Sequence, residues 1–361
     1  RSNFLVLIIT YILSGFASGL WYPYRSNYIE ELGASLVEIG FIASVGSAIS
    51  ALITIPGAYI ADKYGRKRII IVFTYFVAVG YLLNALAPNW GFILLGSVIL
   101  NLSRVYMPAL EALEADSLPK EHRGMGYSFI SMAPSIFSAL SPPIAGLIVS
   151  KYNLVPGMRI LYLATTGIIA LIALIRTMFL RETLIEKKVK PPNLQTHFLD
   201  SIESFNIAFK EMTQDLWRFT LVELITSFET QVFILYLSIY VIQETSVTLL
   251  EWGWINSLYL PISLLLGLPV GKIIDKLKRR QSMLLGYLIQ LPVSIILIFA
   301  VGVKTVALAY ILRAIAQTIQ FPAIHALRAD LVPIEKRGRV FGFISVMKNV
   351  IAVPSALFFG W

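Results

Sequence analysis

The sequence of 361 residues contains no cysteine, only three histidines and few charged residues, which make up 14% of the chain. Without cysteine the chain forms no disulfide, performs no thiol chemistry and holds no Cys-ligated metal. The histidines, His122, His197 and His325, are scattered, so a histidine metal cluster is not expected. A chain with so few charges and 57% hydrophobic residues does not have the composition of a soluble protein.

The charged residues leave eleven apolar runs, each long enough to cross a bilayer. We predict spanning helices near residues 4–24, 38–61, 69–88, 91–115, 124–150, 158–180, 217–242, 250–271, 282–303, 305–331 and 339–361. The first run is interpreted as a spanning helix rather than a signal peptide, because of its length and because the aromatic residues at positions 21–24 suit an anchor at the membrane interface. The predicted fold class is therefore an all-α polytopic membrane protein.

Basic residues divide unevenly between the two sides of this predicted membrane protein. We call side A the side that holds the N-terminus and the loop after the second helix, and side B the opposite side. Twenty Lys and Arg residues fall on side A, whereas side B holds four, Arg25, Lys151, Arg159 and Lys304. Cytoplasmic loops carry an excess of basic residues, so side A, with the N-terminus, is predicted to be cytoplasmic. The net charge of +9 then reflects loops that face an anionic leaflet, and nucleic acid is not an expected partner.

Two loops of side A occur twice in the chain. Residues 56–68 (PGAYIADKYGRKR) return as residues 269–280 (PVGKIIDKLKRR), so that Asp62 aligns with Asp275 and Arg66 with Arg279. Residues 111–124 (EALEADSLPKEHRG) return as residues 325–338 (HALRADLVPIEKRG). Two halves that carry the same loops are typical of a secondary transporter.

The segment between the halves breaks the apolar pattern. It begins with basic residues and Pro191-Pro192, and it continues as a predicted amphipathic helix with Phe198, Phe205 and Phe209 on one side. We therefore predict an N-terminal bundle over residues 1–180, a cytoplasmic linker over 181–218 and a C-terminal bundle over 219–361. Because the chain lacks an initial methionine and ends after the eleventh run, we expect it to be a portion of a longer protein.

Several ionisable residues fall inside the predicted spans. A charge at bilayer depth costs about 2.5–3.5 kcal/mol, so such side chains are expected to face a cavity or one another. The candidate substrate- and proton-binding residues are Arg104, Glu111, Glu229, Arg313 and His325. We expect Arg104, Pro108 and Glu111 to share one helix face, and Arg104 and Glu229 to form the best pair for an anionic substrate and a coupling proton. A fixed structural ion pair is the alternative for these two residues.

Four further charges are predicted to act as a gate at the ends of helices on side A. These are Asp62, Arg66, Asp275 and Arg279. The loops around Glu121 and Glu335 are candidate partners for them. Exposed ion pairs are worth under about 1 kcal/mol, which suits a latch that has to open.

Residues 58–67 resemble the loop signature of the major facilitator superfamily, G-x-x-x-D-R/K-x-G-R/K-R/K, and residues 271–280 resemble its degenerate second-half version. Ala58 replaces the first glycine, with Gly57 one residue earlier, and Lys278 replaces the inner glycine of the second copy. Pro143 and Gly146 also match part of the G-P-x-x-G-G motif of the family's drug–proton antiporters. The resemblance implies two six-helix bundles around a central cavity, of which eleven helices are visible here, and alternating access with the Asp62 loop as a latch.

We therefore expect a secondary active transporter that exports a small organic solute, driven by a proton gradient without a cofactor. Uptake of an organic anion or sugar, held by Arg104 and Arg313, is the alternative among transporters. A transporter-like receptor or subunit without transport is the alternative of another class. The expected form is a monomer in the cell membrane, and no enzyme activity is expected. A pump is disfavoured because the phosphate-loop motif G-x-x-x-x-G-K-S/T is absent from the sequence.

Overall fold

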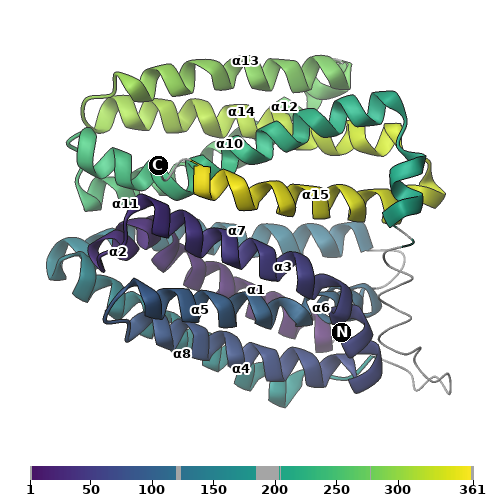
Figure 1. Cartoon of the computed structure of the whole chain (residues 1–361), viewed down its shortest axis with the longest axis horizontal. Coiled ribbons are helices and arrows are strands. Elements are labelled where there is room, and N and C mark those ends of the chain that lie inside the picture. The colour runs from purple at the N-terminus through teal and green to yellow at the C-terminus, as the bar shows by residue number, and fades with distance from the viewer. Residues whose placement is uncertain (1, 119–122, 184–202, 204, 277, 359–361) are drawn as a thin grey trace.

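The structure is a computed structural model that describes residues 2–118, 123–183, 203, 205–276 and 278–358. Its helices form two groups that lie side by side with their axes along the length of the molecule (Figure 1). The helices of the first group, coloured purple to blue, come from the first half of the chain. Those of the second group, coloured teal to yellow, come from the second half, so the two predicted bundles are present.

The N-terminal bundle contains eight α-helices and two short 3₁₀ helices within the described residues. They are α1 (Ser2–Trp21), η1 (Tyr22–Tyr24), α2 (Arg25–Glu31), α3 (Leu36–Tyr64), α4 (Arg66–Ala85), α5 (Trp90–Ser103), η2 (Arg104–Tyr106), α6 (Met107–Ser117), α7 (Arg123–Tyr152) and α8 (Leu154–Phe179). The helices of the C-terminal bundle are α10 (Gln214–Glu244), α11 (Leu249–Ser257), α12 (Tyr259–Lys276), α13 (Arg279–Ile298), α14 (Val303–Leu331), η4 (Ile334–Lys336) and α15 (Arg337–Phe358).

The helices have the length and composition of membrane spans. Within the described residues, ten helical segments are long and apolar enough to cross a bilayer. The last helix, α15, lies at the position of the eleventh predicted run. A chain in lipid has to satisfy its backbone hydrogen bonds internally, which is why apolar runs of this length fold as helices. The prediction of an all-α polytopic membrane protein is confirmed.

Two of the spans are interrupted by a short 3₁₀ helix with a proline in it or shortly after it. Pro23 lies in η1 and Pro108 lies at the start of α6, after η2. Proline lacks an N–H and clashes with the carbonyl four residues earlier, so it disrupts a continuous helix. Residues in a 3₁₀ helix advance by 120° instead of 100°, so η2 rotates the following helix by about 60°. This rotation changes the angle between Arg104 and Glu111 around the axis from about 20° to about 40°, so the interruption alone does not move them to different faces.

Close packing of α1 along α7 organises the N-terminal bundle. A Cβ atom at Gly15 of α1 would lie 2.8 Å from the Cα atom of Pro134 in α7, closer than real side chains approach. A Cβ atom at Gly57 of α3 would lie 2.7 Å from the carbonyl oxygen of Val105 in η2. Glycine at these positions lets two helix backbones touch, as small residues do in membrane bundles. The close contact expected near Ala58 is thus made by Gly57.

The two repeated loops turn their corners differently. Gly65, between α3 and α4, has a φ of +87°, a conformation that favours glycine. At the equivalent position before α13, Lys278 has a φ of −62° and a ψ of 137°. Because that extended conformation suits any residue, the second copy needs no glycine at this position.

The described end of the linker packs against the C-terminal bundle. Residues 205–211 are helical, and the ring of Phe209 meets the ring of Trp217 edge to face, with centroids 5.3 Å apart. Glu211 forms ion pairs with Lys336 at 3.3 Å and Arg339 at 3.6 Å. Phe198, Ile202 and the other linker residues 184–202 lie outside the described residues. The part that is described thus binds the start of α15, and α10 itself begins at Gln214.

Candidate functional site

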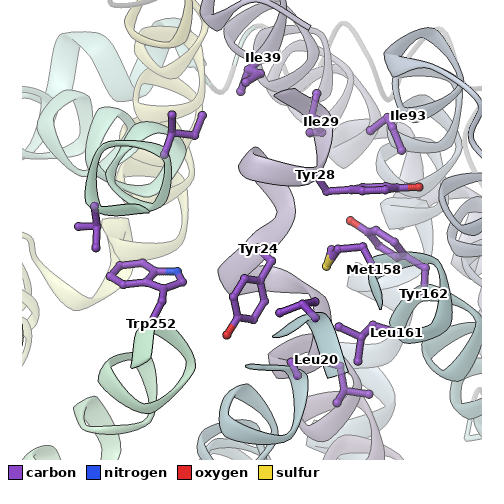
Figure 2. Close-up of a cluster of buried hydrophobic side chains, with 14 of the residues drawn as sticks. Leu20, Tyr24, Tyr28, Ile29, Ile39, Ile93, Met158, Leu161, Tyr162 and Trp252 are labelled. Atoms are coloured by element: carbon purple, nitrogen blue, oxygen red, sulfur yellow. The ribbon is translucent and has the colours of Figure 1, made fainter. Parts of the chain in front are cut away.

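Hydrogen bonds between the two bundles gather on side B, at the left of Figure 1. The Tyr24 hydroxyl donates to the Leu249 carbonyl at 2.7 Å, and Trp252 Nε1 donates to the Pro23 carbonyl at 2.9 Å. Figure 2 shows the Trp252 and Tyr24 side chains on facing segments of the two bundles. The same end holds a bond from Asn27 Nδ2 to the Ser238 carbonyl at 3.3 Å. Together with a buried hydrophobic cluster drawn from both halves, these contacts join the bundles on side B.

Glycines of α7 and α11 bring the bundles together at these contacts, which we call the seal on side B. A Cβ atom at Gly253 would lie 2.5 Å from the Pro142 carbonyl oxygen and 2.6 Å from the Tyr24 hydroxyl. A Cβ atom at Gly146 would lie 2.9 Å from the same hydroxyl. The structure thus places Gly146, which matches part of the antiporter motif, together with Pro142 at the contact between the bundles on side B.

The repeated loops of side A form two equivalent ion pairs. Arg66 at the start of α4 pairs with Asp116 near the end of α6, and Arg279 at the start of α13 pairs with Asp330 near the end of α14. A cation at a helix N-terminus and an anion at a helix C-terminus both oppose the helix dipole, and pairing offsets this cost. Each ion pair joins two helices of the same bundle. Arg66 and Arg279 thus join helix ends inside each half, with Asp116 and Asp330 as their partners. Glu121 of the first predicted partner loop lies outside the described residues.

Asp62 and Asp275 lie in the last turns of α3 and α12. Their side chains are outside what the structure describes, as are those of Glu121 and Arg123. Their predicted gating role stays a prediction.

The predicted residues Glu229 and Arg313 form an ion pair between α10 and α14. Arg313 Nη1 lies 3.3 Å from Glu229 Oε1. The guanidinium carbon also lies 3.4 Å from the centre of the Phe233 ring. The side chain of Arg313 is 8% exposed, whereas that of Glu229 is 44% exposed. Glu229 is therefore paired with Arg313 of its own bundle and not with Arg104, which the sequence had favoured.

A second charged cluster lies beside this pair, in a cavity of about 340 Å³ between α10, α14 and α15. Glu223 forms an ion pair with Arg328, and Lys348 Nζ lies 3.9 Å from the same carboxylate oxygen. Both partners of the first pair are buried. The predicted residue His325 lines this cavity, where its ring lies 4.4 Å from that of Phe321.

The other predicted residues lie in the N-terminal bundle. Arg104 lines a separate cavity with Arg25 and Arg176, two residues that the sequence analysis did not single out. Glu111 is exposed on α6, and the structure shows it in neither charged cluster. On the same helix, the buried Glu114 accepts a hydrogen bond from the Tyr11 hydroxyl.

The sequence contained a signal for part of what was missed. In the aligned repeats Glu114 falls opposite Arg328, so an acid of the first half corresponds to a base of the second. Both residues are buried in the structure. A charge at the same intramembrane position of both halves is a better indicator of a site than a charge in one half alone.

Comparison with known proteins decides the family. The model of the Major Facilitator Superfamily matches residues 7–353. The chain belongs to the Major Facilitator Superfamily. The resemblance seen in the sequence is thereby confirmed, and the chain is a multi-pass membrane transporter of this superfamily and not an enzyme.

Relatives and solved structures span nearly the whole chain. Multidrug resistance protein MdtG of Salmonella schwarzengrund is 22% identical over 99% of this chain and 87% of its own length. An uncharacterized MFS-type transporter of Methanocaldococcus jannaschii is 21% identical over 99% of this chain and 88% of its own length. A bacterial homologue of the human lysosomal transporter Spinster superposes with a TM-score of 0.79 at 18% identity, over 99% of this chain and 81% of that chain. The nucleoside transporter NupG, in its D323A mutant, superposes with a TM-score of 0.76 at 14% identity, over 99% and 90%. These structures support the superfamily fold.

Proposed function

We propose that this transporter exports a small organic solute by alternating access and that proton entry drives the export. The observation that carries the proposal is the ion pair between Glu229 and Arg313. Glu229 lies at the midpoint of α10, which runs from Gln214 to Glu244. A carboxylate at this depth is tolerated only with a compensating partner, water or a proton. It is therefore suited to bind and release a proton during the transport cycle.

The surroundings of Arg313 support this role. If Glu229 took up a proton, its ion pair with Arg313 would be lost. The guanidinium would still lie on the Phe233 ring, and a desolvated cation–π contact of this kind is worth about 2 kcal/mol. The half-exposed carboxylate can thus alternate between its charged and neutral forms without leaving the buried cation unsupported.

The seal on side B supports alternating access. The bonds from Tyr24 to Leu249 and from Trp252 to Pro23 join segments that no covalent link holds together at this end. A rocking motion that separates the bundles on side B has to break a few hydrogen bonds and part the contact at Gly253. The loop charges predict that side A faces the cytoplasm. Because the bundles are joined on side B in this conformation, the solute would enter it from the cytoplasm.

Two observations favour export over uptake. The relative MdtG is named a multidrug resistance protein, although at 22% identity. Pro143 and Gly146 match part of the antiporter motif, and Gly146 packs against the Tyr24 hydroxyl at the seal. Uptake and a receptor without transport remain outcomes of the test below.

The test is transport into proteoliposomes with an acidic lumen. We expect the purified protein to accumulate ethidium or 2-naphthalenesulfonate in the lumen as protons leave. Glu229→Gln mimics the protonated carboxyl, so it should exchange solute in the absence of a gradient but should not accumulate it. Glu251→Gln is the matched control, because Glu251 caps α11 on side B and glutamine also fits a capping box. Exchange without any pH dependence in the wild type would refute proton coupling, and binding without exchange would indicate a receptor.

A further inference from the structure

A cavity of about 440 Å³ lies inside the N-terminal bundle, away from the Glu229–Arg313 pair. It is enclosed by α1, α4, α5 and α8 together with the short helices η1 and η2. Three arginines from three different segments line it: Arg25 at the start of α2, Arg104 at the start of η2 and Arg176 in the last turn of α8. Its described lining contains no acidic residue. The cavity is therefore positively charged.

The three guanidinium groups have only neutral hydrogen-bond partners. Arg25 Nη2 donates to Ser97 Oγ at 3.1 Å, and Arg176 Nη1 donates to Thr74 Oγ1 at 2.9 Å. Arg104 Nη1 donates to a serine hydroxyl at 3.4 Å. Among the side chains that the structure describes, none of the three has a carboxylate within 4.0 Å.

One buried acid, Glu114, offsets part of the Arg176 charge. Its carboxylate accepts a hydrogen bond from Tyr11 and does not line the cavity. Each cation at membrane depth costs about 2.5–3.5 kcal/mol on insertion scales. Three such cations without an ion pair indicate a charge that is kept for a ligand.

One buried donor of the cavity lining has no acceptor among the described residues. It is Arg176 Nε, and the Arg176 residue is only 4% exposed. A buried donor without an acceptor costs about 1–3 kcal/mol, so native structures rarely keep one without a reason. An anionic group beside Arg176 would satisfy this donor and offset part of the guanidinium charge.

The rest of the lining is aromatic and apolar. Rings of Trp21, Tyr22, Tyr81 and Tyr106 surround the cavity, and the Trp21 and Tyr81 ring centres lie 5.6 Å apart. The volume falls in the range of about 300–1,000 Å³ that small organic ligands occupy. A ligand for this site thus combines an anionic group with an aromatic body of one or two rings.

We propose that this cavity binds the carboxylate, sulfonate or phosphate group of a small aromatic solute, so that the transported solute is an organic anion. The assignment of the solute as cargo rests on the proposed transport function. Tyr22 lines this cavity, and its neighbours Pro23 and Tyr24 in η1 form hydrogen bonds with α11 of the second bundle. A solute in the cavity would therefore lie beside the segment that joins the two bundles on side B.

The first experiment measures binding without transport. The purified chain is placed in phosphatidylcholine nanodiscs and titrated by calorimetry with 2-naphthalenesulfonate, its neutral analogue 2-naphthylmethanol and its cationic analogue trimethyl(2-naphthylmethyl)ammonium. We expect the sulfonate to bind at least about tenfold more tightly than either analogue, since hydrogen bonds to charged groups add about 1.5–3 kcal/mol each. Equal affinities for the three probes would overturn the proposal.

Variants test the residues. Arg104→Gln should weaken sulfonate binding at least about tenfold, whereas Arg159→Gln should leave it unchanged, because Arg159 donates to the Ala87 carbonyl outside the cavity. Arg176→Gln removes the buried guanidinium and its unpartnered Nε donor, so it should also weaken binding at least about tenfold. Unchanged affinity in both Arg104→Gln and Arg176→Gln would refute this location for the site.

Two further comparisons distinguish a lipid headgroup from a transported solute, and the cavity proposal from the transport proposal. If replacing half of the phosphatidylcholine by phosphatidylglycerol abolishes sulfonate binding, the cavity holds a lipid headgroup, and the assignment to a transported solute is overturned. If sulfonate binds in an Arg104-dependent way but is not transported, the cavity is supported and the transport function fails. If ethidium is transported but the sulfonate has no preference over its neutral analogue, the cavity proposal fails and the transport function stands.

Discussion

Two glutamates on α10 should respond differently to the same neutral substitution. Glu223 and Glu229 each face an arginine of α14, but their burial differs. The Glu223 side chain is 3% exposed and that of its partner Arg328 is 11% exposed. The Glu229 side chain is 44% exposed. We therefore predict that Glu223→Gln destabilises the fold strongly and that Glu229→Gln does so only slightly.

The magnitudes follow from what each change leaves behind. Glu223→Gln leaves Arg328 buried without its carboxylate, with Lys348 close to the same position, and removal of one partner of a buried pair costs about 3–5 kcal/mol. Glu229→Gln removes a half-exposed carboxylate, and water can take its place beside the buried Arg313, so we expect a cost of about 1 kcal/mol. Arg313 keeps its contact with Phe233. The expected difference between the two variants is therefore about 2–4 kcal/mol.

The measurement is unfolding of the 361-residue chain in bicelles by titration with dodecyl sulfate, monitored by tryptophan fluorescence. A double variant, Glu223→Gln with Arg328→Gln, should regain part of the loss, because it leaves fewer unpaired buried charges. Equal destabilisation by Glu223→Gln and Glu229→Gln would refute the reasoning. The Glu229–Arg313 pair would then be a structural lock, and proton coupling would have to be sought at another carboxyl group.

Three further predictions concern the ends of the bundles. Gly253→Ala should separate the bundles on side B and raise maleimide labelling of a cysteine placed at the buried Ile239 several-fold. Gly167→Ala is the control, because no atom lies near its Cβ position, and it should not raise the labelling. Unchanged labelling in Gly253→Ala would contradict the proposed contact. In a chain without native cysteine, Lys67→Cys should label only from the cytoplasm and Lys304→Cys only from outside, and the reverse pattern would disprove the orientation. The double variant Arg66→Asp with Asp116→Arg exchanges the two charges of the Arg66–Asp116 ion pair, and each new charge then suits the dipole of its helix. It should restore the roughly 1 kcal/mol of unfolding free energy that either single variant loses. A double variant that unfolds more readily than both single variants would contradict the pairing.

The membrane fold could be predicted from the sequence because lipid leaves the backbone few options. The errors lie at helix ends and at interruptions. The third span was predicted to begin at residue 69, but α4 begins at Arg66 and includes three basic residues in its first turn. Long basic side chains can extend to the interface while their backbone stays helical, so a charge does not mark the end of a helix.

The candidate site was predicted only in part, because contacts between helices depend on how each helix is rotated about its axis. Arg313 and Glu229 were both candidates, but their pairing follows from the packing of α14 on α10. Arg104 was expected opposite Glu229, but it lies in the arginine-lined cavity of the first bundle. Arg25 and Arg176 were missed since an arginine near a helix end is indistinguishable in sequence from one that reaches the lipid headgroups.

The two bundles divide the charges in a way that fits the two proposals. In the first bundle Arg25, Arg104 and Arg176 line a cavity without an acid, so these fixed charges are suited to hold an anion and not to exchange protons. In the second bundle the carboxylates of Glu223 and Glu229 are each paired with an arginine. Tyr22 lines the arginine-lined cavity, and its neighbours Pro23 and Tyr24 in η1 form hydrogen bonds with α11 of the second bundle. Separation of the bundles on side B would break these bonds and let η1 move, and this movement would link the occupancy of the arginine-lined cavity to the conformational change that protonation of Glu229 drives.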